Sequence, residues 1–383
     1  MDELKAIDEY PDVSFIENYT LSQLNADMIR WFKEKKKEET GEEIVLAPAD
    51  DRKILLEACA YYLYQGYMFV DQAGKMGLLK YATGKYLDEL GILKKTQRNP
   101  ARGATTTLRF TIQEDRSFAT GIPKGTRATA GNNIYFMTEE YAEIPIGERF
   151  VDVTAICQIE GPAGNYFDIG EINLLVDPVP FINSVSNITM PENGQDVEDD
   201  SSYRLRIYLA PAGYSNAGSE DGYKYFVLSF NSNISDVRVT SPEECEVHIS
   251  YLLENGRIPG EESIKALTEY LKEKGRKPIT DWIVVKAPKQ KSYDIDLTYY
   301  INKSDSNYAT SIQERVEKAI EEYSIWQSSR IGRDINPDEL ISRIKAAGAK
   351  RVVLVNPVFT KISNEEVPVL NVKQTAYGGL EDD

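Results

Sequence analysis

The run TTTLRFTIQ (Thr105–Gln113) marks the point at which the chain changes from a helical to a strand-like pattern. Two similar runs follow it, TRATAGNNIYFMT (Thr126–Thr138) and RFVDVTAICQIEG (Arg149–Gly161). Apolar and polar residues alternate within each run and glycines separate the runs, which is typical of short strands joined by turns. The sequence therefore predicts a compact β-rich domain over residues 98–190.

Residues 1–97, before this domain, carry the spacing of helices. A first helical stretch has apolar residues at helical spacing from Leu24 to Phe32, and Gly41 is expected to end it. In a second stretch, residues 50–71, apolar residues surround the axis instead of forming one stripe, so this helix must be covered on most sides. An ordinary intrachain core would also explain such residues. If another chain supplies the cover, we expect it to contact Leu56, Tyr61, Leu63, Tyr64, Met68 and Phe69.

A linker and two further domains are predicted after the β-rich domain. Residues 191–218 are rich in Gly, Pro, Asn, Ser and Asp and are expected to form a linker around one short element, Tyr203–Leu209. Helix and strand patterns then alternate, which predicts one α+β sandwich over 219–287 and a second over 288–373, before a charged tail over 374–383. The predicted fold class is α+β and multidomain, with an N-terminal helical arm, a central β-rich domain and two C-terminal α+β sandwich domains.

Composition excludes several classes of partner. The chain has 383 residues, with 44 Lys and Arg against 61 Asp and Glu, a net charge of −17 that repels phosphate backbones and anionic lipid. We therefore expect neither nucleic acid nor a membrane as a partner. Cys59, Cys157 and Cys245 form no C-x-x-C pair and predict reduced thiols in a cytoplasm. The single histidine, His248, excludes a two-His zinc site within one chain.

Candidate catalytic and metal sites are weak in the sequence. Residues 213–218 resemble a nucleophile elbow around Ser215, but the spacing is G-x-S-x-x-G and His248 would be the only base. The acidic run from Asp196 lacks the glycine and glutamate that a calcium loop needs at its sixth and twelfth positions. His248 alternates with apolar neighbours in a strand and is expected to be structural. We predict that the protein is not an enzyme and holds no cofactor or metal.

Between Leu79 and about Val285, ordered landmarks resemble the baseplate J-like family. They are an A-x-G-x-x-L-D segment followed by an arginine, an aliphatic-Pro-x-Gly-Thr strand pair, a Gly-x-x-Gly-Asn turn and a D-x-E-x-D-x-x-Y-R-x-R-I segment. Two departures are Asn193-Gly194, where Gly-Gly is usual, and Ser201-Ser202, where acidic residues are usual. The matching residues are Ala82, Gly84, Leu87, Asp88, Arg98, Pro123, Gly125, Thr126, Gly161, Gly164, Asn165, Asp196, Glu198, Asp200, Tyr203, Arg204, Arg206 and Ile207.

This resemblance implies a structural wedge component of the baseplate of a contractile phage tail, or of a related particle such as an R-type bacteriocin. In the family, N-terminal helices bundle with other wedge proteins, and C-terminal domains join neighbouring copies in a six-fold ring around the tail hub. The ring opens to trigger sheath contraction, and hub and sheath-initiator proteins are further expected partners. The chain would assemble in the host cytoplasm and end in the baseplate. The alternative, suggested by 24 tyrosines and many carboxylates, is a carbohydrate-binding or carbohydrate-hydrolysing tail protein.

Overall fold

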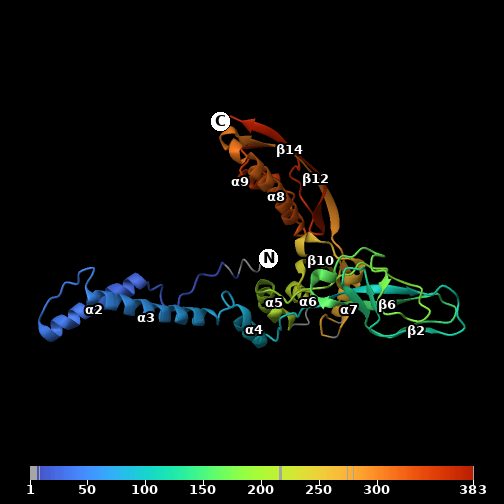
Figure 1. Cartoon of the computed structure of the whole chain (residues 1–383), viewed down its shortest axis with the longest axis horizontal. Coiled ribbons are helices and arrows are strands. Elements are labelled where there is room, and N and C mark those ends of the chain that lie inside the picture. Colours follow the sequence, from blue (N-terminus) through green and yellow to red (C-terminus); the bar gives the residue numbers. More distant parts are fainter. Residues whose placement is uncertain (1–6, 8, 215–217, 274, 279, 383) are drawn as a thin grey trace. The chain divides into compact units, whose positions relative to one another are not determined.

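The computed structural model describes residues 7, 9–214, 218–273, 275–278 and 280–382 (Figure 1). They belong to two compact units, Met1–Gln97 and Arg98–Asp383. The predicted fold class is confirmed: helices come first, a β-rich domain follows, and helices and strands mix in the C-terminal part. The first unit contains α2 (Leu21–Thr40), α3 (Asp51–Lys75) and α4 (Gly84–Leu93).

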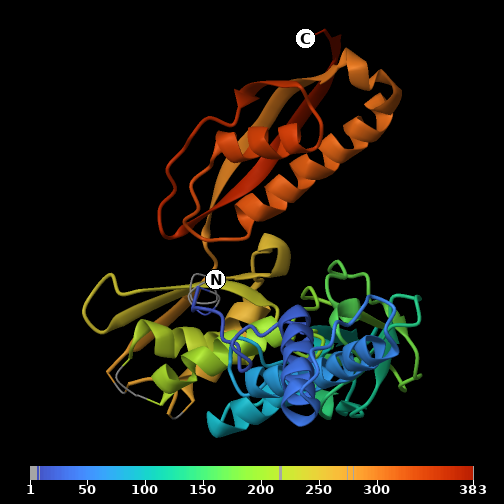
Figure 2. The same cartoon turned by 90° about the vertical axis from the view of Figure 1, so that its left-hand side faces the viewer.

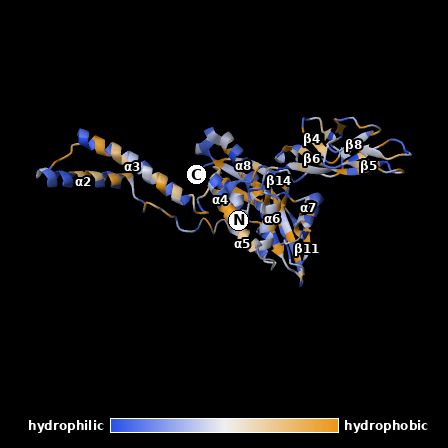
Figure 3. Ribbon diagram, turned by 90° about the horizontal axis from the view of Figure 1, so that it is seen from below, coloured by the Kyte–Doolittle hydropathy of each residue, from blue (hydrophilic) through white to orange (hydrophobic). Residues whose placement is uncertain are grey.

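Local sequence sets the ends of α2. The Thr20 hydroxyl accepts a hydrogen bond from the N–H of Gln23, and the Gln23 side chain accepts one from the N–H of Thr20 at 2.8 Å, which together form a capping box. Gly41 ends the helix in the left-handed conformation, with φ 71°. The chain then turns back, and α3 packs beside α2 as a helical hairpin (Figures 1 and 3).

The β-rich domain of the second unit is built on a six-stranded sheet in the order β7-β3-β4-β6-β1-β8, with β2 and β5 paired separately. Strand β1, next to the outer strand β8, lies antiparallel to both β6 and β8. Side chains such as Leu108, Phe110 and Phe136 fill the core from alternate positions. The bounds are β1 (Gly103–Thr111), β2 (Thr120–Ile122), β3 (Arg127–Thr129), β4 (Tyr135–Thr138), β5 (Ala142–Ile144), β6 (Phe150–Glu160), η1 (Pro162–Gly164), β7 (Leu174–Leu175) and β8 (Ser184–Asn187).

The segment expected as a linker, 191–218, is more ordered than its composition indicates. Its first residues join the β-rich domain through two isolated antiparallel backbone pairings, Glu192 with Thr105 and Gln195 with Arg102. Asp199 then caps a helix, α5 (Asp200–Gly213), that is longer than the expected element. Turn-forming residues raise the expectation of a loop, but here long-range backbone pairing and a cap order the chain.

A buried ion pair joins α5 to the start of the β-rich domain. The Arg206 guanidinium donates to both carboxylate oxygens of Glu198, at 2.7 and 2.6 Å, and the two side chains are only 4% and 1% exposed. The N–H of Asn99 donates to the same carboxylate at 2.9 Å, and Ser229 in α6 lies 3.1 Å from the guanidinium. Arg98 donates to the Glu198 carbonyl and to Asp200. The family landmarks around residues 98 and 198–206 thus form one polar cluster.

Two α+β domains complete the second unit. In the first, α6 (Glu220–Phe230) and α7 (Glu261–Lys272) pack on a sheet in the order β11-β10-β9. In the second, α8 (Ala309–Ser328) and α9 (Pro337–Ala346) lie on one side of a sheet in the order β13-β12-β14 (Figure 2). The remaining bounds are β9 (Ile234–Thr240), β10 (Glu246–Leu253), η2 (Glu254–Gly256), β11 (Trp282–Lys286), β12 (Lys289–Asn302), η3 (Lys303–Tyr308), β13 (Arg351–Asn356) and β14 (Glu366–Glu381).

The last strand, β14, continues through residues expected to form a charged tail. It pairs in parallel with β12 from Glu366 to Glu381, with two register shifts. Its polar and glycine-containing sequence gives a weak strand signal on its own. The long partner strand β12 supplies the backbone hydrogen bonds that extend it.

The buried pair generates a stability prediction. We expect Arg206→Met to lower the free energy of unfolding of the second unit by about 3–5 kcal/mol, because the Glu198 carboxylate would stay buried without its partner. Arg109→Met is the matched control: Arg109 also makes two hydrogen bonds to one carboxylate, that of Asp152, but on the surface, and its loss should cost at most about 1 kcal/mol. Urea unfolding followed by circular dichroism measures both, and equal losses would contradict the assignment.

Candidate interaction surfaces

Helix α3 carries a broad exposed apolar surface. Of the six predicted contact residues, Tyr61, Leu63, Met68 and Phe69 are exposed, while Leu56 and Tyr64 are half-buried. Only Ala60 and Asp71 are buried among the described residues of this helix. The α3 surface also includes residues that the prediction missed although the same all-round pattern contains them: Ile54, Leu55, Tyr62, Tyr67 and Val70.

The width of the α3 surface follows from helical geometry. Residues seven apart lie nearly above one another in a column, and columns that start at successive residues are separated by about 100° around the axis. Three such columns are apolar, and together they span roughly 200° around the helix, with the columns of Ala58 and Cys59 between them. The apolar columns are Ile54, Tyr61 and Met68; Leu55, Tyr62 and Phe69; Leu56, Leu63 and Val70. Ala60 and Asp71 lie on the side of the helix opposite the column of Leu55, Tyr62 and Phe69, and the other two apolar columns flank this buried side. Figure 3 shows the apolar residues of α3 along its length.

Two hollows flank the C-terminal half of α3. One, of about 560 Å³, is lined by Met68, Phe69, Met76 and Tyr81 together with Asp71 and Lys75. The other, of about 510 Å³, is lined by Phe15, Tyr19, Tyr67 and Val70 among others. Hollows of this kind, with aromatic and thioether walls, suit side chains inserted from a packed helix.

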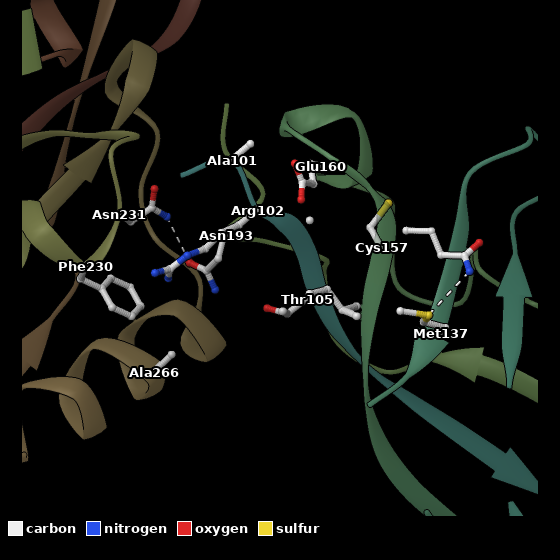
Figure 4. A pocket seen from close by; sticks show the side chains of 13 residues that line it. Ala101, Arg102, Thr105, Met137, Cys157, Glu160, Asn193, Phe230, Asn231 and Ala266 are labelled. Carbon is white, nitrogen blue, oxygen red and sulfur yellow. Dashed lines mark hydrogen bonds between the residues drawn. The ribbon is translucent and has the colours of Figure 1, made fainter. Parts of the chain in front are cut away.

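A groove of about 530 Å³ lies in the second unit between the β-rich domain and the first α+β domain (Figure 4). Arg102, Glu160 and Cys157 come from the β-rich side, while Phe230 and Ala266 come from α6 and α7. Burial raises the pKa of the Cys157 thiol, so this sulfur stays protonated and is a poor nucleophile at neutral pH. The lining therefore offers packing and hydrogen bonding in place of covalent chemistry.

His248 is held in a polar row on the first α+β sheet. Its Nε2 lies 2.7 Å from Glu246 Oε1, and its Nδ1 lies 2.9 Å from Lys286 Nζ. Because the lysine ammonium can only donate, Nδ1 accepts a hydrogen bond from Lys286, and the Nε2–H group donates one to the Glu246 carboxylate. Ser215, the nucleophile of the rejected elbow, lies outside the described residues. Within the described ranges no cluster of His, Cys, Asp and Glu could hold a metal ion.

The segment from Glu192 to Gln195 makes hydrogen bonds to four parts of the second unit: the turn after β6, the β1 region, the loop after α6 and the start of α7. Asn165 pairs with Gly194 through two hydrogen bonds, donating to its carbonyl at 2.8 Å and accepting from its N–H at 2.9 Å. A Cβ on Gly194 would lie 2.5 Å from the Gly161 carbonyl oxygen, so only glycine fits. Asn193 takes a positive φ of 68°, which asparagine tolerates better than most residues, and this explains how it replaces the usual glycine.

The Glu192 carboxylate caps α7. Its Oε1 accepts from the N–H of Gly260 at 3.0 Å, at the start of that helix, while its second oxygen is buried without a protein hydrogen bond. Burial raises the pKa of the Glu192 carboxyl above its ordinary value of about 4.5, against the effect of the backbone N–H groups. Charging this group in the folded state therefore costs stability.

Three models of one family match successive stretches of the chain: the baseplate J-like protein barrel domain at residues 107–194, the central domain at 215–287 and the C-terminal domain at 293–372. Baseplate protein J of Escherichia phage P2 is 28% identical over 225 residues, which cover 58% of this chain and 73% of that protein. A chain in the 6-fold symmetrised structure of the anti-feeding prophage baseplate aligns over 96% of this chain and 97% of its own length, at 12% identity and a TM-score of 0.39. None of the helices in the described part of the chain combines the length and hydropathy needed to cross a membrane.

The raised pKa of Glu192 generates a pH prediction. A raised folded-state pKa means that the stability contribution is complete below about pH 4.5 and is lost as the pH rises through the folded-state value. We therefore expect Glu192→Gln to gain stability relative to the natural chain between about pH 4 and about pH 7. Urea midpoints at the two pH values measure this difference.

Glu365→Gln is the control, because its stability relative to the natural chain should change with pH in the opposite direction. Lys286 and Lys289 hold the pKa of Glu365 below its ordinary value, so its contribution is present at neutral pH and is lost on acidification. Glu365→Gln should therefore lose stability relative to the natural chain as the pH rises. The same sign for both variants would contradict the role given to Glu192.

Proposed function

The chain belongs to the baseplate J-like family, and from this premise we propose that it is a wedge component of the baseplate of a contractile phage tail or a tail-like particle such as an R-type bacteriocin. In this proposal it acts by binding other proteins, without catalysis. It assembles in the host cytoplasm and then remains in the baseplate, where the tail hub and sheath-initiator proteins are further partners.

The α3 surface is the observation that carries the proposal. Large apolar side chains such as Leu55, Tyr62 and Phe69 are exposed along one helix. Contact between this apolar surface and water is unfavourable, so covering it with a partner chain lowers the free energy. Three apolar columns are wider than the contact that one added helix makes, because a packed helix covers a stripe of roughly 100°. We infer that at least two helices from wedge partners pack on α3, besides its own neighbour α2.

The predicted contact residues divide between these roles. Tyr61, Leu63, Met68 and Phe69 are available to partner helices, whereas the half-buried Leu56 and Tyr64 also support the hairpin with α2. Of the 24 tyrosines that suggested a carbohydrate site, Tyr61, Tyr62 and Tyr67 are exposed on α3 among leucine, methionine and valine. That mixture is more typical of helix packing than of a sugar platform.

The C-terminal part of the chain supports the proposed ring. Each α+β domain has a three-stranded sheet, and each of its two outer strands has one neighbouring strand among the residues that the structure describes. Open sheet edges are suited to pairing with other chains, and repeated contacts between identical chains close symmetric assemblies. We propose that these edges join neighbouring wedges around the tail hub. The ring then opens when its contacts switch between two arrangements that differ by a few kcal/mol per subunit, and this change triggers sheath contraction.

Imaging tests where the chain lies. Electron microscopy of particles that carry a label on this chain should show the label encircling the tail hub, next to the end of the sheath. A label in the receptor-binding fibres would contradict the proposal.

Charge on the α3 surface should block assembly. Met68→Lys and Phe69→Lys are expected to leave the free chain folded, because these side chains are already 45% and 69% exposed. Each lysine would bury an unpaired charge in the bundle, which should reduce incorporation into particles by at least about tenfold. Circular dichroism measures folding, and quantitative immunoblotting of purified particles measures incorporation.

Glu34→Lys is the control, since it places a lysine at an exposed position on α2 with a larger change of net charge than either α3 variant. It should be incorporated like the natural chain. Normal incorporation of both α3 variants would disprove the bundle.

A further inference from the structure

Strand β13 is an unprotected sheet edge. It lies at the side of the β13-β12-β14 sheet, and its outward-facing Val353 and Val355 are 40% and 59% exposed. Val352 and Leu354, which face the helices, are only half-buried, so the apolar core also continues to this edge. Edge strands in proteins that stay monomeric usually carry charges that block pairing. Here both faces of the strand are apolar at its centre.

Two other outer strands of the α+β sheets, β14 and β9, differ from β13. Strand β14 carries Lys373, Gln374 and Glu381, and β9 carries Asp236 and Arg238. These polar and charged residues are the usual protection of a sheet edge. The sequence RVVLVN of β13 has a longer apolar run than β14 or β9, and the remaining outer strand, β11 (WIVVK), has an apolar run of the same length as β13.

Charge at the β13 edge is compatible with approach of an identical strand. Arg351 is the charged residue of this strand, and its guanidinium pairs with Glu381 of β14, with Nε 3.0 Å from Oε2. The pair lowers the pKa of Glu381, so both groups stay charged and neutralise each other. Two copies of this edge therefore meet without an unbalanced cation.

We propose that β13 pairs antiparallel with β13 of a second copy of this chain, across a two-fold axis at Val353. This inference rests on the proposed ring, and it names the strand through which two copies join. A two-fold contact joins copies in pairs, so a second, different contact links the pairs around the ring. The two sheets become one sheet of six strands, with the helices of both copies on the same side, as a two-fold axis perpendicular to a sheet requires.

The side-chain pattern selects the register. Residues directly opposite in an antiparallel pair share a face of the sheet. With the axis at Val353, this residue meets its own copy, Val352 meets Leu354, and Arg351 meets Val355, so the helix-side pairs are all apolar. With the axis at Leu354, Val352 would meet Asn356 and place an amide on the apolar side. The first register buries no polar side chain on the core face.

Two further apolar residues extend the contact. Val358 and Phe359 follow β13 and are both 64% exposed. The surface area that one short pair of strands buries is smaller than the ~1,000 Å² that a stable free dimer buries. We therefore expect the pairing to be weak between free chains and to form where the ring holds two copies close together, which raises their effective concentration.

A cysteine at the axis tests this contact. Directly opposed residues in antiparallel strands have Cα atoms about 4.5–5.5 Å apart, within the range that a disulfide spans. In the full chain with the exposed Cys59 and Cys245 changed to serine, Val353→Cys should join most copies into covalent dimers when assembled particles are oxidised. Val355→Cys is the matched control, because its own copy lies about four residues away along the strand, or roughly 13 Å. Non-reducing electrophoresis of the particles gives the dimer fraction.

The outcomes separate the two proposals. Dimers with Val353→Cys and not with Val355→Cys support the pairing and its register. Three results from particles that contain the chain overturn the strand pairing and leave the wedge assignment standing. They are no dimers, equal dimer fractions with both variants, and dimers only when the two variants are mixed. Absence of the chain from purified particles overturns the wedge assignment and the strand pairing together.

Discussion

The buried pair of Glu198 and Arg206 is the interaction on which the second unit depends. Removing two charges from water is expensive, and the pair is tolerable only because further hydrogen bonds complete it. The backbone of Asn99 and the hydroxyl of Ser229 supply them. Since these groups come from the start of the β-rich domain and from α6, satisfying one ion pair fixes three segments of the chain at once. The direction in which α5 and α6 leave the β-rich domain follows from this requirement.

A second set of contacts gives the same region its geometry. Asn165, Gly194 and Glu192 join the turn after β6, the strand β1 and the first turn of α7. These contacts explain why several family landmarks are spread over about a hundred residues of sequence and still act together. Their role is to set the relation between domains within the second unit, and this leaves the outer surfaces free for other chains.

The sequence alone predicted the helices and strands that local residue patterns determine. Strand alternation around Thr105–Gln113 and helical spacing around α2 and α3 are local signals, and the structure has strands and helices there. The order within 191–218 could not be predicted, because Glu192 and Gln195 are ordered by partners far away in sequence. Leu56 and Phe69 are both apolar, and the residue pattern alone does not separate the half-buried residue from the exposed one. The open edge at β13 depends on strand order, which residue patterns do not contain.

The contact between the two α+β domains is small. Leu252, Ile331 and Val367 form its buried apolar centre, Asp236 accepts a hydrogen bond from the N–H of Ile331 at 2.8 Å, and the chain crosses between the domains at Ala287 and Pro288. Each domain keeps its own larger core. Because this contact is smaller than either core, rotation between the two domains costs less than unfolding either of them, and the short connection at residues 287–288 limits how far the outer domain can swing.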